Sequence, residues 1–305
     1  MYRIDNIKVP VGAELTKSRI AGRAKIPEDK IKEYKIIKKA VDARKKTDVH
    51  YVYSVLIDTD VKLSAFKEMT VERYSFPKGR QNKKRPLIVG FGPCGMFAAL
   101  MLAESGYRPI VIERGADIDA RRAAVELFRQ TGVFSTETNV QFGEGGAGTF
   151  SDGKLNSGIN DKRCRFVLET FAKFGAPQEI TYSAKPHMGT DVLSGVVKNI
   201  RNAVEKNGGD VRFLHKLTGI ETKNGHVCGA RITSESGEYS IDTDTILLAI
   251  GHSARDTYKM VYDMGANMEQ KNFSVGVRIE HKQSMINKSQ YGDFADKLDA
   301  ADYKL

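Results

Sequence analysis

The chain has 305 residues, 41% of them hydrophobic, which is enough to bury an ordinary core in two domains and excludes a disordered protein. Its longest apolar stretch, around 96–103, is far shorter than the roughly 18 residues that span a bilayer, and the charged start MYRIDNIKVP lacks the apolar segment of an export signal. Three scattered cysteines exclude a disulfide framework, and the six histidines show no metal-ligand spacing. We therefore expect a cytoplasmic protein with no membrane contact and no metal.

Positive charge is concentrated at one end of the sequence. The formal net charge is +10, yet residues 1–85 hold 22 Lys and Arg against 11 Asp and Glu, while the remaining residues hold 26 against 27. The basic excess belongs to residues 1–76 and to the connector PKGRQNKKR at 77–85, which has Pro and Gly and no apolar residue besides. That composition indicates a domain boundary after a basic N-terminal module.

The first 76 residues predict a small α+β module. IKVP and HYVYSVLID (50–58) have strand patterns, and in the second the side chains alternate between two faces. Short helices are expected near 14–24 and 27–33. From residue 85 onward strands and helices alternate, which is typical of a parallel α/β sheet.

The stretch 86–115 predicts a βαβ unit around the spacing G-x-G-x-x-G. Its strand, helix and second strand are expected at 86–90, 93–105 and 109–115. In such a unit Gly90 makes the tight turn, Gly92 lets a pyrophosphate approach the backbone and Gly95 allows close helix packing. Glu113, 18 positions after Gly95, ends the second strand where an acid binds ribose hydroxyls. The pattern favours an adenine dinucleotide, with its phosphates at the positive helix end, over a ligand-free turn.

The same spacing recurs in QFGEGGAGTFSDGK at 141–154. The residues before it are polar, and Ser, Asp and Gly follow it in place of helix formers, so it is not a second dinucleotide fingerprint. Residues 142–153 still include five glycines, although glycine loses the most conformational freedom on ordering. Two interpretations remain open here: a backbone that closely approaches a flat or anionic ligand, and a mobile surface loop.

The following residues predict the remainder of an α/β domain. Residues 191–209 have the pattern of an amphipathic helix that ends at Gly-Gly. Residues 211–251 predict a strand, a meander with turns at 224–225 and 236–237, and the apolar strand TILLAIG. Gly251 follows that strand at the edge of the sheet where ligands bind.

These motifs together resemble the FAD-binding fold of the glutathione reductase superfamily. More closely, they are similar to the bacterial NAD(FAD)-utilizing or FAD-dependent dehydrogenases. The resemblance covers essentially the whole chain, including KAVDARKK near the N-terminus. Its motifs are RPLIVGFGPCGMFAALMLAESGYRPIVIERG (85–115), NVQFGEGGAGTFSDGKL (139–155), AKPHMGTD (184–191), LLAIGHSARDT (247–257) and FSVGVRIEHKQ (273–283).

The resemblance implies that one FAD is held by two loops. The first glycine loop and Glu113 would bind the ADP half, the loop 143–154 would lie against the pyrophosphate, ribityl chain and flavin, and the backbone at Leu217 would meet adenine. The cofactor-binding residues implied in this way are Gly90, Gly92, Pro93, Gly95, Glu113, Arg114, Gly143, Gly145, Gly146, Ala147, Gly148, Lys154, Leu217, Ile250 and Gly251.

The sequence departs from the superfamily at its end. Members close the flavin site with a late strand, Gly-Asp and a glycine-rich helix start, whereas the Gly-Asp at 292–293 here has no buried strand before it and no glycines after it. We therefore expect an FAD-binding domain at 86–271 and, at 272–305, the start of a C-terminally truncated substrate domain.

Three residues are candidates for catalysis, and each has a structural alternative. Lys154, together with Asp152, would lie near the flavin N1/N5 edge or form an ordinary loop ion pair. His252 would face the ring as a proton donor or be a structural histidine. His187 would line the substrate cavity or serve at a helix entry beside an Asp191 cap.

Three further residues carry reactive or charged groups. Arg278 and His281 would anchor an acidic substrate or pair with Glu280. Cys94 lies at a helix N-terminus, where a small residue is needed for packing beside the phosphates. No C-x-x-C spacing exists, so disulfide reductase chemistry is not expected.

The sequence thus predicts an FAD-dependent oxidoreductase that transfers hydride through flavin N5 to or from an unidentified organic substrate, with NAD(P)H as a candidate electron donor. The alternative is a flavin-binding protein without turnover, either regulatory or attached to nucleic acid through residues 1–85. The sequence shows neither the oligomeric state nor the substrate.

Overall fold

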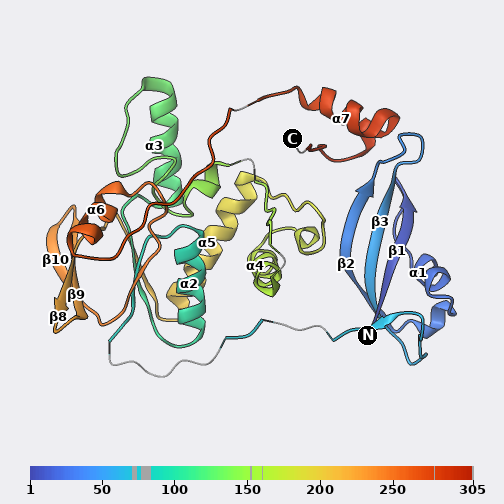
Figure 1. Cartoon of the computed structure of the whole chain (residues 1–305), viewed down its shortest axis with the longest axis horizontal. Helices are drawn as coiled ribbons and strands as arrows, with labels where there is room; N and C mark the ends of the chain where they lie inside the picture. The colour runs from blue at the N-terminus through green and yellow to red at the C-terminus, as the bar shows by residue number, and fades with distance from the viewer. Residues whose placement is uncertain (71–73, 77–83, 152, 160, 278, 304–305) are drawn as a thin grey trace.

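The computed structural model describes residues 1–70, 74–76, 84–151, 153–159, 161–277 and 279–303. The N-terminal residues form an antiparallel sheet at one end of the molecule, and the second part of the chain, which contains a parallel sheet, extends from there to the other end (Figure 1). Residues 77–83 of the predicted connector lie outside the described residues. Within the described ranges, no helix has both the length and the apolar character to cross a membrane.

The N-terminal module is a four-stranded antiparallel sheet in the order β2-β3-β1-β4, with one helix on one face. Ile4, Val55 and Ile57 of the sheet and Ile20 of the helix are fully buried in a shared core. Its elements are β1 (Tyr2–Pro10), α1 (Lys17–Ala24), the 3-10 turn η1 (Glu28–Lys30), β2 (Glu33–Asp42), β3 (His50–Asp58) and β4 (Lys67–Glu68).

Strand β2 is the main difference from the predicted module. Its pairing with β3 slips by one residue between Ile36 and Lys38, so the side chains lose the strict alternation that reveals a strand in sequence. The helix expected near 27–33 is only the short turn η1, and the chain enters β2 directly after it.

The second part of the chain contains the predicted parallel sheet, in the order β11-β5-β6-β7. Strands β5 and β6 pair in parallel, and α2 lies between them in the sequence, as the predicted βαβ unit requires. Helix α2 packs against α5. The bounds are β5 (Leu87–Val89), α2 (Pro93–Glu104), β6 (Ile110–Glu113), α5 (Thr190–Lys206), β7 (Asp210–Phe213) and β11 (Ile246–Leu248).

The two faces of this sheet have different covers because strand side chains alternate. Ile88 and Val111 point into the core shared with α2 and α5. Leu87 and Ile112 point into a second core, which the predicted antiparallel meander closes on the other face. The meander consists of β8 (Lys216–Lys223), β9 (His226–Ser234) and β10 (Gly237–Asp242).

The remaining helices connect and flank these sheets (Figure 1). One backbone junction joins the two parts: the Lys39 amide of β2 donates to the Tyr182 carbonyl (2.7 Å), and the Ala184 amide donates back to the Lys39 carbonyl (2.8 Å). The elements not yet named are α3 (Ile118–Thr131), η2 (Ala147–Phe150), α4 (Lys162–Lys173), η3 (Gln178–Thr181), α6 (Arg255–Asp263), α7 (Gln283–Tyr291) and η4 (Gly292–Lys297).

Candidate functional site

The first glycine loop joins β5 to α2, and two of its three glycines are required by the packing of the protein itself. Gly90 has φ +100°, and a Cβ placed on it would lie 2.4 Å from the Ala249 carbonyl oxygen. A Cβ on Gly95 would lie 1.9 Å from the Gly90 carbonyl oxygen. The turn and the close approach of helix to strand therefore exclude any side chain at both positions.

Gly92 is different, because no neighbouring atom excludes a side chain there. Its φ is −75°, and a Cβ would make only an ordinary contact of 3.7 Å with the Gly146 Cα. Gly92 is the N-cap of α2, makes no side-chain cap hydrogen bond, and is followed by Pro93 in the first helical position. The first amides of α2 and the positive end of its dipole thus meet a glycine that leaves room for a ligand.

The second glycine loop lies directly against the first. The Gly145 amide donates to the Phe91 carbonyl (2.9 Å), and a Cβ on Gly146 would lie 3.0 Å from the Gly92 Cα. Gly143, Gly145 and Gly146 all have φ between +66° and +118°, a region in which L side chains are strained. The two matches to one glycine spacing therefore form a single cradle, and a short 3-10 helix, η2, begins inside the second match at Ala147.

Glu113 ties the two loops together from the end of β6. Its side chain is buried and accepts hydrogen bonds from the amides of Phe91 (2.8 Å), Gly115 (2.9 Å) and Gly143 (2.9 Å). Oε1 accepts two of these bonds and Oε2 accepts one, so Oε2 keeps capacity for a further donor such as a sugar hydroxyl. The carboxylate thus lies at the place predicted for it, with a structural task in addition to any ligand contact.

Two buried charges beneath the second loop were missed by the sequence reasoning. Arg121 of α3 is fully buried, and burial lowers its pKa to about 10, so it stays protonated at neutral pH. Glu144 is also fully buried, accepts from the Ile118 amide (2.8 Å) and has its pKa raised by burial. The signal that could have revealed Arg121 is its spacing, because it falls on the apolar stripe of α3 between Ile118 and Val125.

Comparison with known proteins shows a family of FAD-binding domains for this part of the chain. A family model described as FAD binding domain matches residues 84–250, more than half of the chain. The chain belongs to this FAD binding domain family. Residues 1–58 match a domain of unknown function, and residues 272–305 match a model described as FAD-dependent protein, C-terminal domain-like. We call residues 84–250 the FAD-binding part.

One relative and two solved structures illustrate the range of similar proteins. An uncharacterized protein of Clostridium beijerinckii is 44% identical over 321 residues, which cover 99% of this chain and 59% of that protein. The chain therefore spans about three fifths of the length of this relative. THI4 of Thermovibrio ammonificans is 19% identical, with 60% of this chain and 64% of that chain covered and a TM-score of 0.40. A 3-ketosteroid-Δ4-(5α)-dehydrogenase of Rhodococcus jostii RHA1 is 15% identical, with 64% and 50% covered and a TM-score of 0.38. Such low scores give no basis for assigning a reaction.

Within the FAD-binding part, two of the three catalytic candidates lie together. Lys154 and His187 form an isolated antiparallel β-bridge, and the Met188 amide donates to the Gly153 carbonyl (2.9 Å) beside it. A Cβ on Gly153 would lie 3.3 Å from His187 Nε2, so this ring packs on the end of the second glycine loop. Both candidate side chains are exposed. Asp191 does not cap the following helix, because the N-cap of α5 is Gly189 and makes no side-chain bond.

The third candidate, His252, lies at the carboxyl end of β11, three residues after the Ala249 that touches Gly90. It is exposed, and its Nδ1 lies 2.8 Å from Ser253 Oγ. Gly251 beside it has φ +65° with no atom within 4 Å of an added Cβ.

Contacts within the protein account for the position of the Arg114 side chain, without a contact to a cofactor. It donates to Glu137 (2.7 Å) and to Asp256 (2.8 and 2.9 Å), and its guanidinium lies 4.4 Å from the centroid of the Phe142 ring. Lys216 of β8 joins the same ion-pair network. The hydrogen bonds from Arg114 hold the pKa of Asp256 well below its usual range.

The other predicted residues have varied surroundings. Leu217 is buried between the sheet and the meander, and Ile250 is half-buried. Cys94 is exposed in the first turn of α2, and His281 bonds to Tyr303 through Nδ1 (2.7 Å). Asp152 and Arg278 lie outside the described residues.

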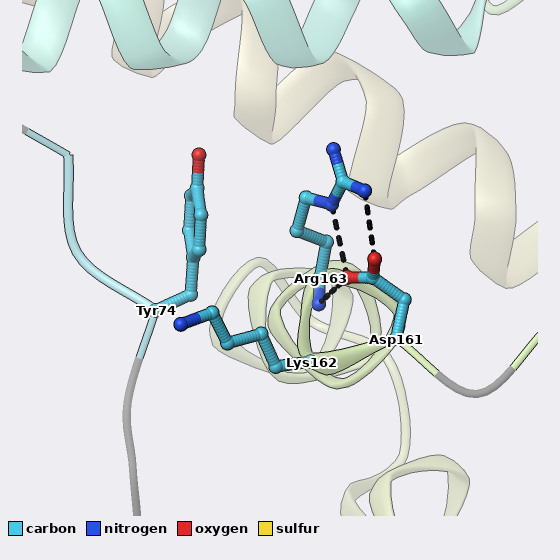
Figure 2. A pocket seen from close by; sticks show the side chains of 4 residues that line it. All are labelled: Tyr74, Asp161, Lys162 and Arg163. Carbon is cyan, nitrogen blue, oxygen red and sulfur yellow. Dashed lines mark hydrogen bonds and ion pairs between the residues drawn. The ribbon is translucent and has the colours of Figure 1, made fainter.

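A pocket of about 480 Å³ lies at the start of α4 and shares no residue with the glycine cradle (Figure 2). It is lined by Tyr74, Asp161, Lys162 and Arg163. Asp161 caps α4 through the Arg163 amide (2.8 Å) and pairs with the Arg163 guanidinium (2.7 and 2.9 Å). Helix capping and this ion pair therefore account for two of the lining residues, Asp161 and Arg163.

Proposed function

We propose that this chain carries the FAD-binding part of an FAD-dependent oxidoreductase of the glutathione reductase type. The family match supports FAD as the cofactor, and the parallel sheet covered on one face by a meander supports the architecture. When bound, FAD would supply hydride transfer, for an organic substrate and an electron donor that are both unidentified. NAD(P)H is the donor we propose to test first.

The observation that carries the proposal is that the packing of the protein itself does not require glycine at position 92. Packing within the protein explains glycine at Gly90 and Gly95 but not at Gly92, which tolerates a Cβ at 3.7 Å from its nearest neighbour. This position adjoins the uncapped start of α2 and the second loop at Gly146. Packing does not require glycine at this helix N-terminus, but a pyrophosphate that approaches the backbone would require it.

The residues around the cradle have separable tasks in this proposal. The amides at the start of α2 and the Ala147 amide of the second loop would hold the diphosphate, and Oε2 of Glu113 would accept from a ribose hydroxyl. The ribbon containing Lys154 and His187 lies at the far end of the second loop. From there the exposed amine and imidazole would hold an anionic substrate group or move a proton at the substrate.

The first prediction separates ligand binding from folding at Gly92. Gly92→Ala should change the free energy of unfolding by no more than about 0.5 kcal/mol yet weaken FAD binding about tenfold or more, because the added methyl occupies the space of the phosphate. Binding is measured by the change in flavin fluorescence on titration with FAD. Gly195→Ala, inside α5 with no atom within 4 Å, is the matched control and should leave FAD affinity unchanged. Equal FAD affinity of Gly92→Ala and wild type would contradict the proposed site.

The second prediction concerns the reaction. Anaerobic addition of NADH or NADPH to the FAD-loaded chain should bleach the yellow flavin band, with the Clostridium beijerinckii relative measured in parallel. A spectrum that stays unchanged in both proteins with both nucleotides would reject a nicotinamide donor. That result would favour the alternative of a flavin-binding protein without turnover.

A further inference from the structure

Arg121 is fully buried, as is Glu144, and the hydrogen bonds of its guanidinium go to residues 139–149, which lead into the second glycine loop and form its first part. Its side chain has 0% exposure. Nε donates to the Asn139 carbonyl (2.9 Å) and Nη2 donates to the Val140 carbonyl (2.9 Å). Nη1 is shared between the carbonyls of Glu144 (2.6 Å) and Gly146 (2.9 Å), the Thr149 hydroxyl (2.9 Å) and, more distantly, the Gly143 carbonyl (3.3 Å).

These bonds fix the direction of the loop amides. In a trans peptide the carbonyl and the following N–H point in opposite directions. Because the Gly146 carbonyl points to Arg121, the Ala147 amide points away from it, on the other side of the loop. Gly146 itself contacts Gly92 and Pro93, with a Cβ reaching 3.0 and 3.1 Å from them. Arg121 therefore collects carbonyls on the buried side of the loop. The Gly145 amide donates to the Phe91 carbonyl of the first loop (2.9 Å), and the Ala147 amide is left for the side opposite Arg121.

Burying the Arg121 guanidinium also costs free energy, which argues that this residue does more than fill the core. Removing a guanidinium from water carries a large penalty, offset here by several carbonyls and by the nearby carboxylates of Glu113 and Glu144. The stem of Arg121 touches the loop as well, since a Cβ on Gly143 would lie 2.5 Å from its Cδ. An apolar side chain could fill this core position but could not orient the loop peptides.

We propose that Arg121 is a positioning residue for the cofactor: it holds the second glycine loop in the shape that faces the first loop, and it thereby sets the affinity for FAD. This inference rests on the proposed function. It assigns no contact between Arg121 and the cofactor, because the loop backbone separates the guanidinium from the Gly92 side.

The test compares Arg121→Lys with Arg122→Lys in the full chain. Lysine keeps the charge and the stem of Arg121 but cannot reach all of its acceptors, so FAD should bind about tenfold more weakly or worse. Arg122 is the matched control, because it lies on the same helix and donates to Ser194 Oγ (2.6 Å) instead of to the loop. FAD affinity is measured by flavin fluorescence, and thermal unfolding is measured with and without saturating FAD.

A role in folding alone would give a different result. It would lower the unfolding temperature equally with and without FAD and leave the FAD dissociation constant of Arg121→Lys within twofold of wild type, which would overturn the inference. The expected result is that FAD raises the unfolding temperature less in Arg121→Lys than in wild type. If wild type itself bound no FAD, the proposed function would fail and the inference with it.

A second variant covers a failure of Arg121→Lys to fold. Thr149→Val removes one acceptor of Arg121 and one donor to the Gly146 carbonyl, at a buried site and with little change in shape. One lost hydrogen bond should weaken FAD binding about fivefold. Unchanged affinity in this variant would contradict the inference independently of Arg121.

Discussion

At the scale of single residues, the glycines of the cradle divide into those required by the fold and those left for a ligand. Gly90 belongs to the first class through its φ of +100° and its contact with Ala249. Gly148 belongs to the second, since it has no atom within 4 Å of an added Cβ. The shared pattern G-x-G-x-x-G conceals this difference, because sequence alone does not show which neighbour approaches each position.

The third prediction uses this division. Gly90→Ala should destabilise the protein by about 3 kcal/mol or more, because it combines a strained φ with a contact of 2.4 Å to backbone. Gly148→Ala should change the free energy of unfolding by less than about 1 kcal/mol. Urea denaturation of both variants measures the difference. Equal stabilities would show that the turn at Gly90 is not as tight as described.

At the scale of elements, a network of four charged side chains joins β6, β8 and α6. Arg114 at the end of β6 and Lys216 of β8 both pair with Glu137 and Asp256. This network connects the meander, through Lys216 of β8, and helix α6, through Asp256, to the end of β6. Partly exposed pairs of this kind stabilise modestly, but their pH dependence is diagnostic.

The fourth prediction is the pH dependence of this network. The pKa of Asp256 is lowered from its ordinary value of 3.8, mainly by hydrogen bonds from Arg114. A folded-state pKa below the unfolded one adds stability that is complete above the unfolded value and is lost as the pH falls toward the folded one. Asp256→Asn should therefore be less stable than wild type by about 1 kcal/mol or less at pH 7, and the gap should close as the pH falls below about 4.

The control for Asp256→Asn is Asp263→Asn, which removes an exposed pair with Lys259 on the same helix. Thermal unfolding from pH 7 to pH 2 follows both variants. A gap between Asp256→Asn and wild type that stays constant with pH would contradict the network as described.

At the scale of the whole molecule, local patterns predicted the fold better than the site. The βαβ unit, the helix α5 and the meander follow from periodicity and turn residues within short windows, and the structure confirms them. Strand β2 was not predicted because the bulge at Ile36 breaks the alternation of side chains between the two faces of the strand. The burial of Arg121 and Glu144 was not predicted because charged residues normally indicate a solvated face. Only packing between residues far apart in sequence buries them. The assignments of individual cofactor contacts stay predictions.

The basic N-terminal module illustrates the same limit. Several of its cations have acidic partners, including Arg3 with Asp5, Lys32 with Asp60 and Arg44 with Asp42. Lys39 pairs with Glu179 of the second part, and Lys35 lies 3.7 Å from Glu169. Part of the charge that the sequence left available for nucleic acid is therefore used within the molecule, and the nucleic-acid hypothesis stays a prediction.

The junction at Lys39 has a mechanical consequence. Ala184, which bonds to Lys39, lies only three residues before His187, and no regular element intervenes to absorb a displacement. We therefore expect that a displacement of β2 at Lys39 would also displace His187, whose imidazole lies beside Gly153. The sheet and the far end of the second glycine loop are thus connected through a segment of three residues, although Lys39 and Gly153 are far apart in sequence.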